Sequence, residues 1–271
     1  MLLIIGGHPR SGTTLLQHLS NSHPDMLITH EFGNFCHLDR PYKEYRRRIL
    51  MRLWNTGILR NRTLLWSTIN GESRKIVKIV KGHAKANAFV ARYLLEMHKH
   101  RRKLIGVAEI ELILRSIFPK ARIVGDKLPD YVFSLDKLVG LRGLSCLIIY
   151  RDCREVTGST LEWFRTVERN DKHWIDNLST AEKIAKRWVR AIELMERHAE
   201  KVHIIRYEDL IQKPEQELEA LGRWLGVDPA GFQRKMIPDT SSGKHKKRLS
   251  EKELATVMEI AGPTMARLVY I

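Results

Sequence analysis

Residues 2–16 read LLIIGGHPRSGTTLL, and this stretch organises the rest of the chain. Leu2–Ile5 is a short apolar run of strand length, glycines punctuate the residues that follow, and Thr13 begins a helix with Leu15 and Leu16 in its apolar stripe. A strand, a glycine-rich loop and a helix N-terminus form an anion site, because unpaired backbone N–H groups and the helix dipole point at one spot. The stretch therefore predicts an α/β fold with an anion-binding loop after its first strand.

The spacing from Gly7 to Gly12 matches G-x-x-x-x-G, the first half of a nucleotide-binding P-loop. The second half differs, since Thr13 stands where an NTPase has Lys and Arg10 is the only Lys or Arg inside the loop. That Lys normally steadies the β- and γ-phosphates, so an ordinary ATP site is disfavoured. A P-loop nucleotide kinase-like enzyme remains an alternative, although no segment matches a Walker B pattern convincingly.

The run PRSGTT after an apolar strand resembles the 5′-phosphosulfate loop of the sulfotransferases that use 3′-phosphoadenosine 5′-phosphosulfate (PAPS), in their tyrosylprotein, carbohydrate and bacterial types. The resemblance implies a three-layer, P-loop-like α/β fold with a central parallel β-sheet flanked by helices. It also implies PAPS as the sulfuryl donor and 3′,5′-ADP as the by-product. The residues that it assigns to the 5′-phosphosulfate are Pro9, Arg10, Ser11, Gly12, Thr13 and Thr14.

A second strand is expected over Asp25–His30, with Glu31 at its carboxyl end. Ligands of open α/β sheets collect at the carboxyl ends of strands, so Glu31 is expected near the loop. In tyrosylprotein-type and related sulfotransferases, a Glu at this distance after the loop Arg is the catalytic base, and the spacing from Arg10 to Glu31 resembles that pattern. His30 is the competing base, because other branches use His and its ordinary pKa suits general-base work near neutral pH.

A third strand is expected over Ala121–Gly125, followed at its carboxyl end by Asp126-Lys127-Leu128-Pro129. These four residues resemble the family's D/E-K-x-P segment, whose Lys contacts the transferring sulfuryl group. A cation there neutralises charge on the bridging and leaving oxygens, by analogy with phosphoryl transfer. Lys127 and Arg10 are therefore expected to act on the leaving side.

The apolar run Leu144–Tyr150 predicts a central buried strand, and Arg151 follows it with Ser159 eight residues later on a helix. The pair resembles the family's 3′-phosphate site, because an Arg fork and a hydroxyl match phosphate oxygens. Tyr207 begins a YEDL run that resembles a common structural section, and it is counted with the expected cofactor-binding residues. A basic loop near the C-terminus, which resembles a loop placed over the nucleotide in the family, adds Ser242, Gly243 and Lys244.

The chain has 271 residues and is expected to form a single sulfotransferase domain, 1–271, with a basic helical insertion at about 40–103. The formal net charge is +16, and the basic segment (residues 40–103) holds 18 Lys and Arg against three acids. A field this one-sided favours an anionic partner, such as PAPS, an acidic acceptor or nucleic acid. A basic polyanion-binding protein is thus a further alternative, and a solvated helical face would explain the charge equally well.

Three scattered cysteines and the lack of metal-ligand spacing predict neither a disulfide framework nor a metal site. No apolar run approaches membrane-spanning length, and the first residues are too short for a signal peptide. We therefore expect a cytoplasmic enzyme of bacterial type, with a trimmed Golgi-type chain as the other possibility. The expected reaction is in-line transfer of a sulfuryl group from PAPS to a hydroxyl or amine, with a carbohydrate or small molecule favoured as acceptor and the oligomeric state left open.

Overall fold

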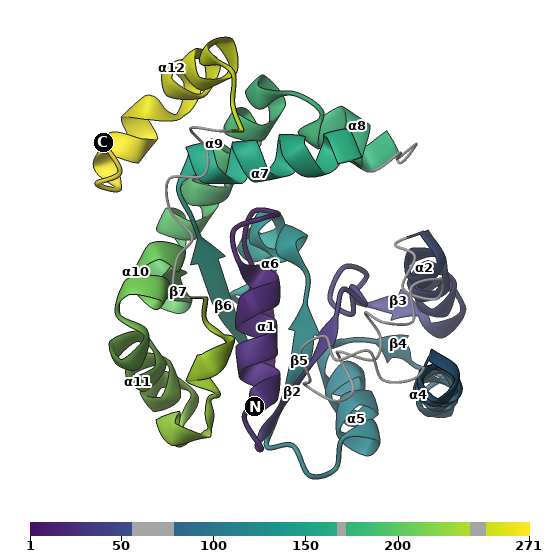
Figure 1. Ribbon diagram of the computed structural model, residues 1–271. Helices are drawn as coiled ribbons and strands as arrows, with labels where there is room; N and C mark the ends of the chain where they lie inside the picture. The colour runs from purple at the N-terminus through teal and green to yellow at the C-terminus, as the bar shows by residue number, and fades with distance from the viewer. Residues whose placement is uncertain (56–78, 167–171, 239–247) are drawn as a thin grey trace.

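A parallel five-stranded sheet forms the centre of the molecule (Figure 1). The computed structural model, which describes residues 1–55, 79–166, 172–238 and 248–271, gives the strand order β2-β5-β1-β6-β7. Every neighbouring pair in this sheet is parallel. The strands are β1 (Leu2–Gly6), β2 (Met26–His30), β5 (Ile123–Lys127), β6 (Leu144–Tyr150) and β7 (His203–Arg206).

The central strand β1 is buried on both faces, which explains its uninterrupted apolar sequence. Leu3 and Ile5 pack into one core, and Leu2 and Ile4 pack into the other. The first core includes α1 (Thr13–Ser22), α10 (Tyr207–Gln212) and α11 (Pro214–Leu225). The second core includes α5 (Val107–Ile117), α6 (Leu135–Leu138) and α9 (Ala181–Arg197). The expected α/β architecture, with a parallel sheet flanked by helices, is confirmed.

Three more helices gather with α9 beyond the carboxyl end of β6 (Figure 1). They are α7 (Cys153–Thr166), α8 (Lys172–Leu178) and α12 (Glu251–Arg267). Short 3-10 turns join other elements: η1 (Pro129–Ser134), η2 (Ala199–Lys201), η3 (Pro229–Gly231) and η4 (Arg234–Met236). Arg151 and Asp152 are the two residues between the end of β6 and the start of α7, so α7 begins at the edge of the sheet where ligands of this fold class bind.

The basic segment begins in β3 (Arg40–Pro41), which pairs antiparallel with β4 (Leu104–Ile105), the strand that directly follows the segment. Its described helices are α2 (Tyr42–Asn55) and α4 (Ile79–Lys99). Each helix buries one apolar side, whereas Arg46 and Arg47 are exposed. The buried residues are Tyr42, Tyr45, Ile49 and Leu53 of α2 and Phe89, Tyr93 and Met97 of α4.

One expected boundary is wrong. The third strand extends to Lys127 rather than ending at Gly125, because its pairing with β1 and β2 continues to Lys127 opposite Ile5 and His30. At the start of α9, Ser179 and Glu182 have the spacing of a capping box, but Thr180 is the N-cap and accepts a hydrogen bond from the Lys183 amide. The Ser179 hydroxyl instead donates to the Ile175 carbonyl of α8.

Candidate active site

The glycine-rich loop (Gly7–Gly12) joins β1 to α1 and adopts a backbone that requires glycine at both ends. Gly7 has φ 151° and Gly12 has φ 102°. A Cβ on Gly7 would lie 2.2 Å from the Ile149 carbonyl oxygen, and a Cβ on Gly12 would lie 2.5 Å from Cδ2 of Tyr207. Gly12 is the N-cap of α1 and offers no side-chain acceptor, so the first-turn N–H groups are left for a bound anion.

Arg10 links this loop to α7. Its backbone has φ 70°, and its Nε donates a hydrogen bond of 3.0 Å to the Ser159 hydroxyl. Burial and the nearby guanidinium groups of Arg151 and Arg248 lower the pKa of Arg10, with Glu162 acting in the opposite direction. Cations gathered in this way create a positive potential that favours an anionic ligand. Arg10 and Ser159, assigned by sequence to different ends of PAPS, are in direct contact.

Arg151 lies directly after β6 and is 9% exposed. Its Nη2 donates to Glu155 Oε2 at 3.3 Å, and its guanidinium lies 4.4 Å from the centre of the Tyr207 ring. Its carbonyl oxygen accepts a 2.9 Å hydrogen bond from Trp188 Nε1 of α9. Three helices therefore contact Arg151: α7 through Glu155, α9 through Trp188 and α10 through Tyr207.

Glu31 and Lys127 form an ion pair at the carboxyl ends of β2 and β5. Lys127 Nζ lies 2.8 Å from Glu31 Oε1 and 3.4 Å from the Thr14 hydroxyl of α1. The Lys127 side chain is fully buried, whereas the Glu31 side chain is 29% exposed. Burial by itself raises the pKa of Glu31, but the Lys127 ammonium, with smaller contributions from His30 and Arg52, outweighs burial and holds this pKa at about 2. Glu31 is therefore a carboxylate at neutral pH.

The backbone of Glu31 is held as firmly as its side chain. Glu31 has φ 57°, and its amide donates to the Lys127 carbonyl oxygen at 2.7 Å. Its own carbonyl oxygen accepts a 2.9 Å hydrogen bond from Nε of Arg52 in α2. The basic segment thus contacts the expected base directly through Arg52, a residue that the sequence did not single out among the many cations around it.

His30 is buried beside Glu31 and is neutral. Its Nδ1 lies 2.7 Å from Gln17 Oε1, and Gln17 Nε2 donates to the Ile28 carbonyl, which fixes the orientation of the amide. Nδ1 therefore carries the proton, and Nε2 faces Glu31 Oε1 at 3.9 Å. Burial, reinforced by the Lys127 charge, lowers the pKa of His30 to about 3.

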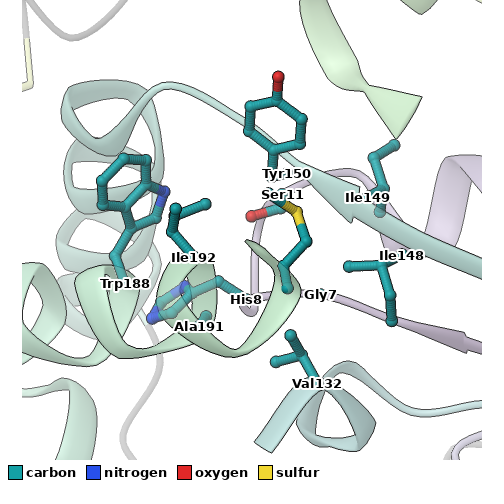
Figure 2. A pocket seen from close by; sticks show the side chains of 11 residues that line it. Gly7, His8, Ser11, Val132, Ile148, Ile149, Tyr150, Trp188, Ala191 and Ile192 are labelled. Carbon is teal, nitrogen blue, oxygen red and sulfur yellow. The ribbon is translucent and has the colours of Figure 1, made fainter. Parts of the chain in front are cut away.

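Pro9, Ser11 and His8 line the other side of the loop. The Pro9 carbonyl accepts a 2.8 Å hydrogen bond from His8 Nδ1, and burial lowers the pKa of His8 to about 4. Within the part of the chain that the structure describes, His8 Nε2 and the buried Ser11 hydroxyl have no hydrogen-bond partner. Both residues line a small cavity between the loop and α9, where Trp188 and other apolar side chains gather (Figure 2).

The structure brings twelve expected residues to the carboxyl edge of the sheet: Pro9, Arg10, Ser11, Gly12, Thr13, Thr14, His30, Glu31, Lys127, Arg151, Ser159 and Tyr207. Ser242, Gly243 and Lys244 lie outside the described residues. Arg248, just beyond them, pairs with Glu162 of α7 at 2.9 Å. The sequence places Arg248 in the same basic run, but the resemblance does not assign it to the cofactor.

Neither a metal centre nor a membrane span is found in the described ranges. No group of three or more His, Cys, Asp or Glu side chains there could hold a metal ion. Across the same ranges, no helix combines the length and the apolar character needed to cross a bilayer. Burial raises the pKa of Cys153, so this thiol next to Arg151 is a poor nucleophile.

Comparison with known proteins agrees with this geometry. The sulfotransferase family model matches residues 3–230. The sulfotransferase domain of the olefin synthase of Synechococcus PCC 7002 is 17% identical with a TM-score of 0.56, and the match covers 94% of this chain and 82% of that chain. Sulfotransferase STF9 of Mycobacterium avium is 15% identical with a TM-score of 0.52, covering 98% and 76%. At these identities the likeness shows the fold.

No curated protein matches the chain. The family model, however, spans most of the sequence and includes both the glycine-rich loop and the segment from Arg151 to Ser159. The chain belongs to the sulfotransferase family.

Proposed function

We propose that this protein transfers a sulfuryl group from PAPS to a hydroxyl or amine of a carbohydrate or small-molecule acceptor. One observation carries the proposal: the Lys127 ammonium contacts both the Thr14 hydroxyl, in the first turn of α1 after the glycine-rich loop, and the Glu31 carboxylate. An anion site, a buried cation and a partly exposed carboxylate therefore meet at one point. In-line transfer needs these three groups on the donor, leaving and acceptor sides.

The residues present fit PAPS. The N-terminus of α1 has no side-chain cap, so its first-turn amides are available to the oxygens of a ligand. Thr14 adds a hydroxyl, and Arg10 adds a guanidinium next to Ser159. We assign the 5′-phosphosulfate to residues 9–14 on this basis.

The 3′-phosphate is assigned to Arg151 and Ser159, with Tyr207 supporting the Arg151 guanidinium. The guanidinium charges of Arg151 and Arg248 both lower the pKa of Arg10, so both lie close enough to Arg10 to interact with it. Arg guanidinium groups bind phosphate oxygens in a bidentate manner. This group of cations therefore favours a nucleotide that carries a 3′-phosphate, which ATP lacks. Arg248 is a further candidate contact for the same phosphate.

Bound PAPS would supply an activated sulfuryl group: a bond from sulfur to the acceptor oxygen or nitrogen forms, the bond to the bridging phosphate oxygen breaks, and 3′,5′-ADP leaves. We assign the acceptor's proton to the Glu31 carboxylate. The exposed fractions of the two side chains favour Glu31 over His30, at 29% against 7%. His30 also has its Nδ1 proton engaged by Gln17.

Glu31 is a weak base while Lys127 holds its pKa at about 2. An anion placed against Thr14 and the glycine-rich loop would compete with Glu31 for the Lys127 ammonium. Loss of that contact raises the pKa of Glu31, because burial then acts on it with less opposition. Binding of the donor would in this way prepare the base, and Lys127 with Arg10 would steady the charge on the leaving side.

The first test is calorimetric titration of the full chain with 3′,5′-ADP beside Mg-ATP. We expect metal-independent binding of 3′,5′-ADP and much weaker binding of ATP. Preferred binding of ATP, or no binding of either nucleotide, would contradict the proposal. Binding of any polyanion with a steep salt dependence, and no preference for 3′,5′-ADP, would favour the polyanion-binding alternative.

The second test assigns the base. Labelled PAPS is incubated with a panel of carbohydrates and small hydroxyl compounds, and product formation is compared for the wild type, Glu31→Gln and His30→Gln. Glu31→Gln should abolish turnover while its affinity for 3′,5′-ADP stays nearly unchanged. Full activity of Glu31→Gln together with loss of activity in His30→Gln would move the base to His30.

A further inference from the structure

The loop after β2 (residues 31–35) has an unusual backbone that other groups must hold in place. Glu31 has φ 57° and Gly33 has φ 71°, so two residues of this short loop are left-handed. The left-handed conformation is unfavourable for Glu because of its Cβ. Contacts outside the residue must therefore compensate, and the structure shows where they come from.

The Asp126 carboxylate collects three consecutive main-chain amides of this loop. Its Oδ2 accepts from the Gly33 amide at 2.8 Å and from the Asn34 amide at 3.1 Å, and its Oδ1 accepts from the Phe32 amide at 3.2 Å. Asp126 has no exposed surface. A buried carboxylate that receives three successive amides fixes the path of the backbone directly after Glu31.

Two hydroxyl groups complete the shell around the same carboxylate. Thr29 Oγ1 donates to Asp126 Oδ1 at 2.6 Å, and the Tyr131 hydroxyl donates to Oδ2 at 2.5 Å. Burial raises the pKa of Asp126 above its ordinary value, although the hydrogen bonds from Thr29, Tyr131 and the Asn34 amide act in the opposite direction. All five partners are donors, so this environment is built for the ionised form, which only accepts hydrogen bonds.

The helices of the basic segment hold the far end of the same loop. The Tyr45 hydroxyl of α2 donates to the Asn34 carbonyl oxygen at 3.0 Å, and the Tyr93 hydroxyl of α4 donates to Asn34 Oδ1. Burial raises the pKa of both tyrosines, so they are neutral donors. The loop is therefore held from the sheet by Asp126 and from the basic segment through Asn34.

We propose that Asp126 is a positioning residue that sets the place of the Glu31 carboxylate beside Lys127, acting through the main chain of residues 32–34. Asp126 and Lys127 are neighbours in β5 and therefore point to opposite faces of the sheet. The carboxylate of Asp126 holds the backbone after Glu31, while the carbonyl and the ammonium of Lys127 hold its amide and its side chain. The functional importance of this arrangement rests on the proposed role of Glu31 as the base.

The test replaces Asp126 by Asn and measures the protonation of Glu31. In the variant, an NH2 group replaces one carboxylate oxygen and cannot accept hydrogen bonds from the main-chain amides of residues 32–34. The loop is then no longer fixed, and Glu31 separates from Lys127. Carboxyl carbons of ¹³C-labelled Glu are followed by NMR from pH 3 to pH 6, and the Glu31 signal is assigned by its absence in Glu31→Gln. Wild-type Glu31 should not titrate in this range, whereas in Asp126→Asn its midpoint should rise to the ordinary value of 4.5.

Two control variants separate positioning from a general disturbance of the core. Thr29→Val and Tyr131→Phe each remove one hydrogen bond to the Asp126 carboxylate and leave the three amides bound. In both controls Glu31 should stay deprotonated at pH 3. A Glu31 midpoint below pH 3 in Asp126→Asn would overturn the proposal, and so would equal midpoints in all three variants.

Calorimetry with 3′,5′-ADP keeps this proposal distinct from the proposed function. Asp126→Asn should bind 3′,5′-ADP within about threefold of the wild type, because the glycine-rich loop is not touched. If the wild type fails to bind 3′,5′-ADP, the sulfotransfer proposal fails, and the titration still decides whether Asp126 positions Glu31. If Asp126→Asn does not fold, hydrogen exchange in the wild type decides: the amides of residues 32–34 should exchange as slowly as those of β5, and exchange as fast as in an exposed loop would overturn the proposal.

Discussion

Replacing Lys127 by Met removes the cation that holds the Glu31 carboxylate and keeps most of the buried volume of the side chain. In the folded protein the pKa of Glu31 is about 2, against an ordinary value of 4.5. This difference corresponds to about 3 kcal/mol of folding stability at neutral pH. Lys127 is the strongest of the groups that lower this pKa, so the variant should lose most of that contribution.

The sign of the pH dependence follows from the direction of the shift. A pKa that is lowered on folding stabilises the protein above the ordinary pKa, and the stabilisation is lost as the pH falls toward the folded value. About 1 kcal/mol of the Glu31 contribution therefore remains at pH 3. The difference in the free energy of unfolding between wild type and Lys127→Met should shrink by up to about 2 kcal/mol between pH 7 and pH 3.

Urea unfolding followed by circular dichroism at the two pH values measures this difference. Lys186→Met is the matched control, since Lys186 pairs with Glu182 at 2.6 Å on the surface of α9 with both side chains more than half exposed. Solvent screens that pair, so its removal should cause no comparable pH-dependent change. An equal stability difference at pH 7 and pH 3 for Lys127→Met would refute the idea that Lys127 holds Glu31 in its charged form.

Three further predictions test the cofactor and acceptor sides. Arg151→Ala should weaken the binding of 3′,5′-ADP by about tenfold or more and that of 5′-AMP far less, because a charged hydrogen bond to the 3′-phosphate is lost. Equal losses of affinity for the two nucleotides in calorimetry would show that Arg151 does not bind the 3′-phosphate. Gly12→Ala should lower the midpoint of thermal unfolding by about 4 °C or more, because of its φ of 102° and a contact of 2.5 Å with Tyr207; an unchanged midpoint would mean that the loop adapts. Replacing Arg46 and Arg47 together by Ala should change which acceptors are sulfated by labelled PAPS and leave 3′,5′-ADP binding unchanged; an identical acceptor profile would leave these exposed cations without a part in acceptor choice.

The parallel sheet and the glycine-rich loop could be predicted because their signals are local. Leu144–Tyr150 forms a strand with the expected bounds, since a fully buried strand needs an apolar residue at nearly every position. Thr13 begins α1 as expected, after glycines whose conformations few other residues adopt. The sequence also predicted that Glu31 and Lys127 follow parallel strands at their carboxyl ends, and the structure shows that the two side chains meet at that edge.

Burial and long-range partners could not be predicted. His30 and Glu31 stand side by side in the sequence as rival bases, and only the structure shows that one is buried against Gln17 while the other is partly exposed. Arg52 and Asp126 contact residues 31–34 across sequence separations of 21 to 94 positions, over which periodicity says nothing. At the start of α9, Ser179 and Thr180 both suit an N-cap. The Ser179 hydroxyl donates to the Ile175 carbonyl of α8, and Thr180 is the N-cap.

The pairing of β3 with β4 has a consequence for how the basic segment can be exchanged. Because Arg40–Pro41 and Leu104–Ile105 lie side by side, the two ends of the basic segment are close together in space. Such a segment is a natural unit of exchange between homologous enzymes, since a replacement of different length need not alter the register of the five-stranded sheet. The structure also sets the condition for a working chimera: the incoming segment must carry donors equivalent to Tyr45 and Tyr93, because Asn34 receives both hydroxyl groups.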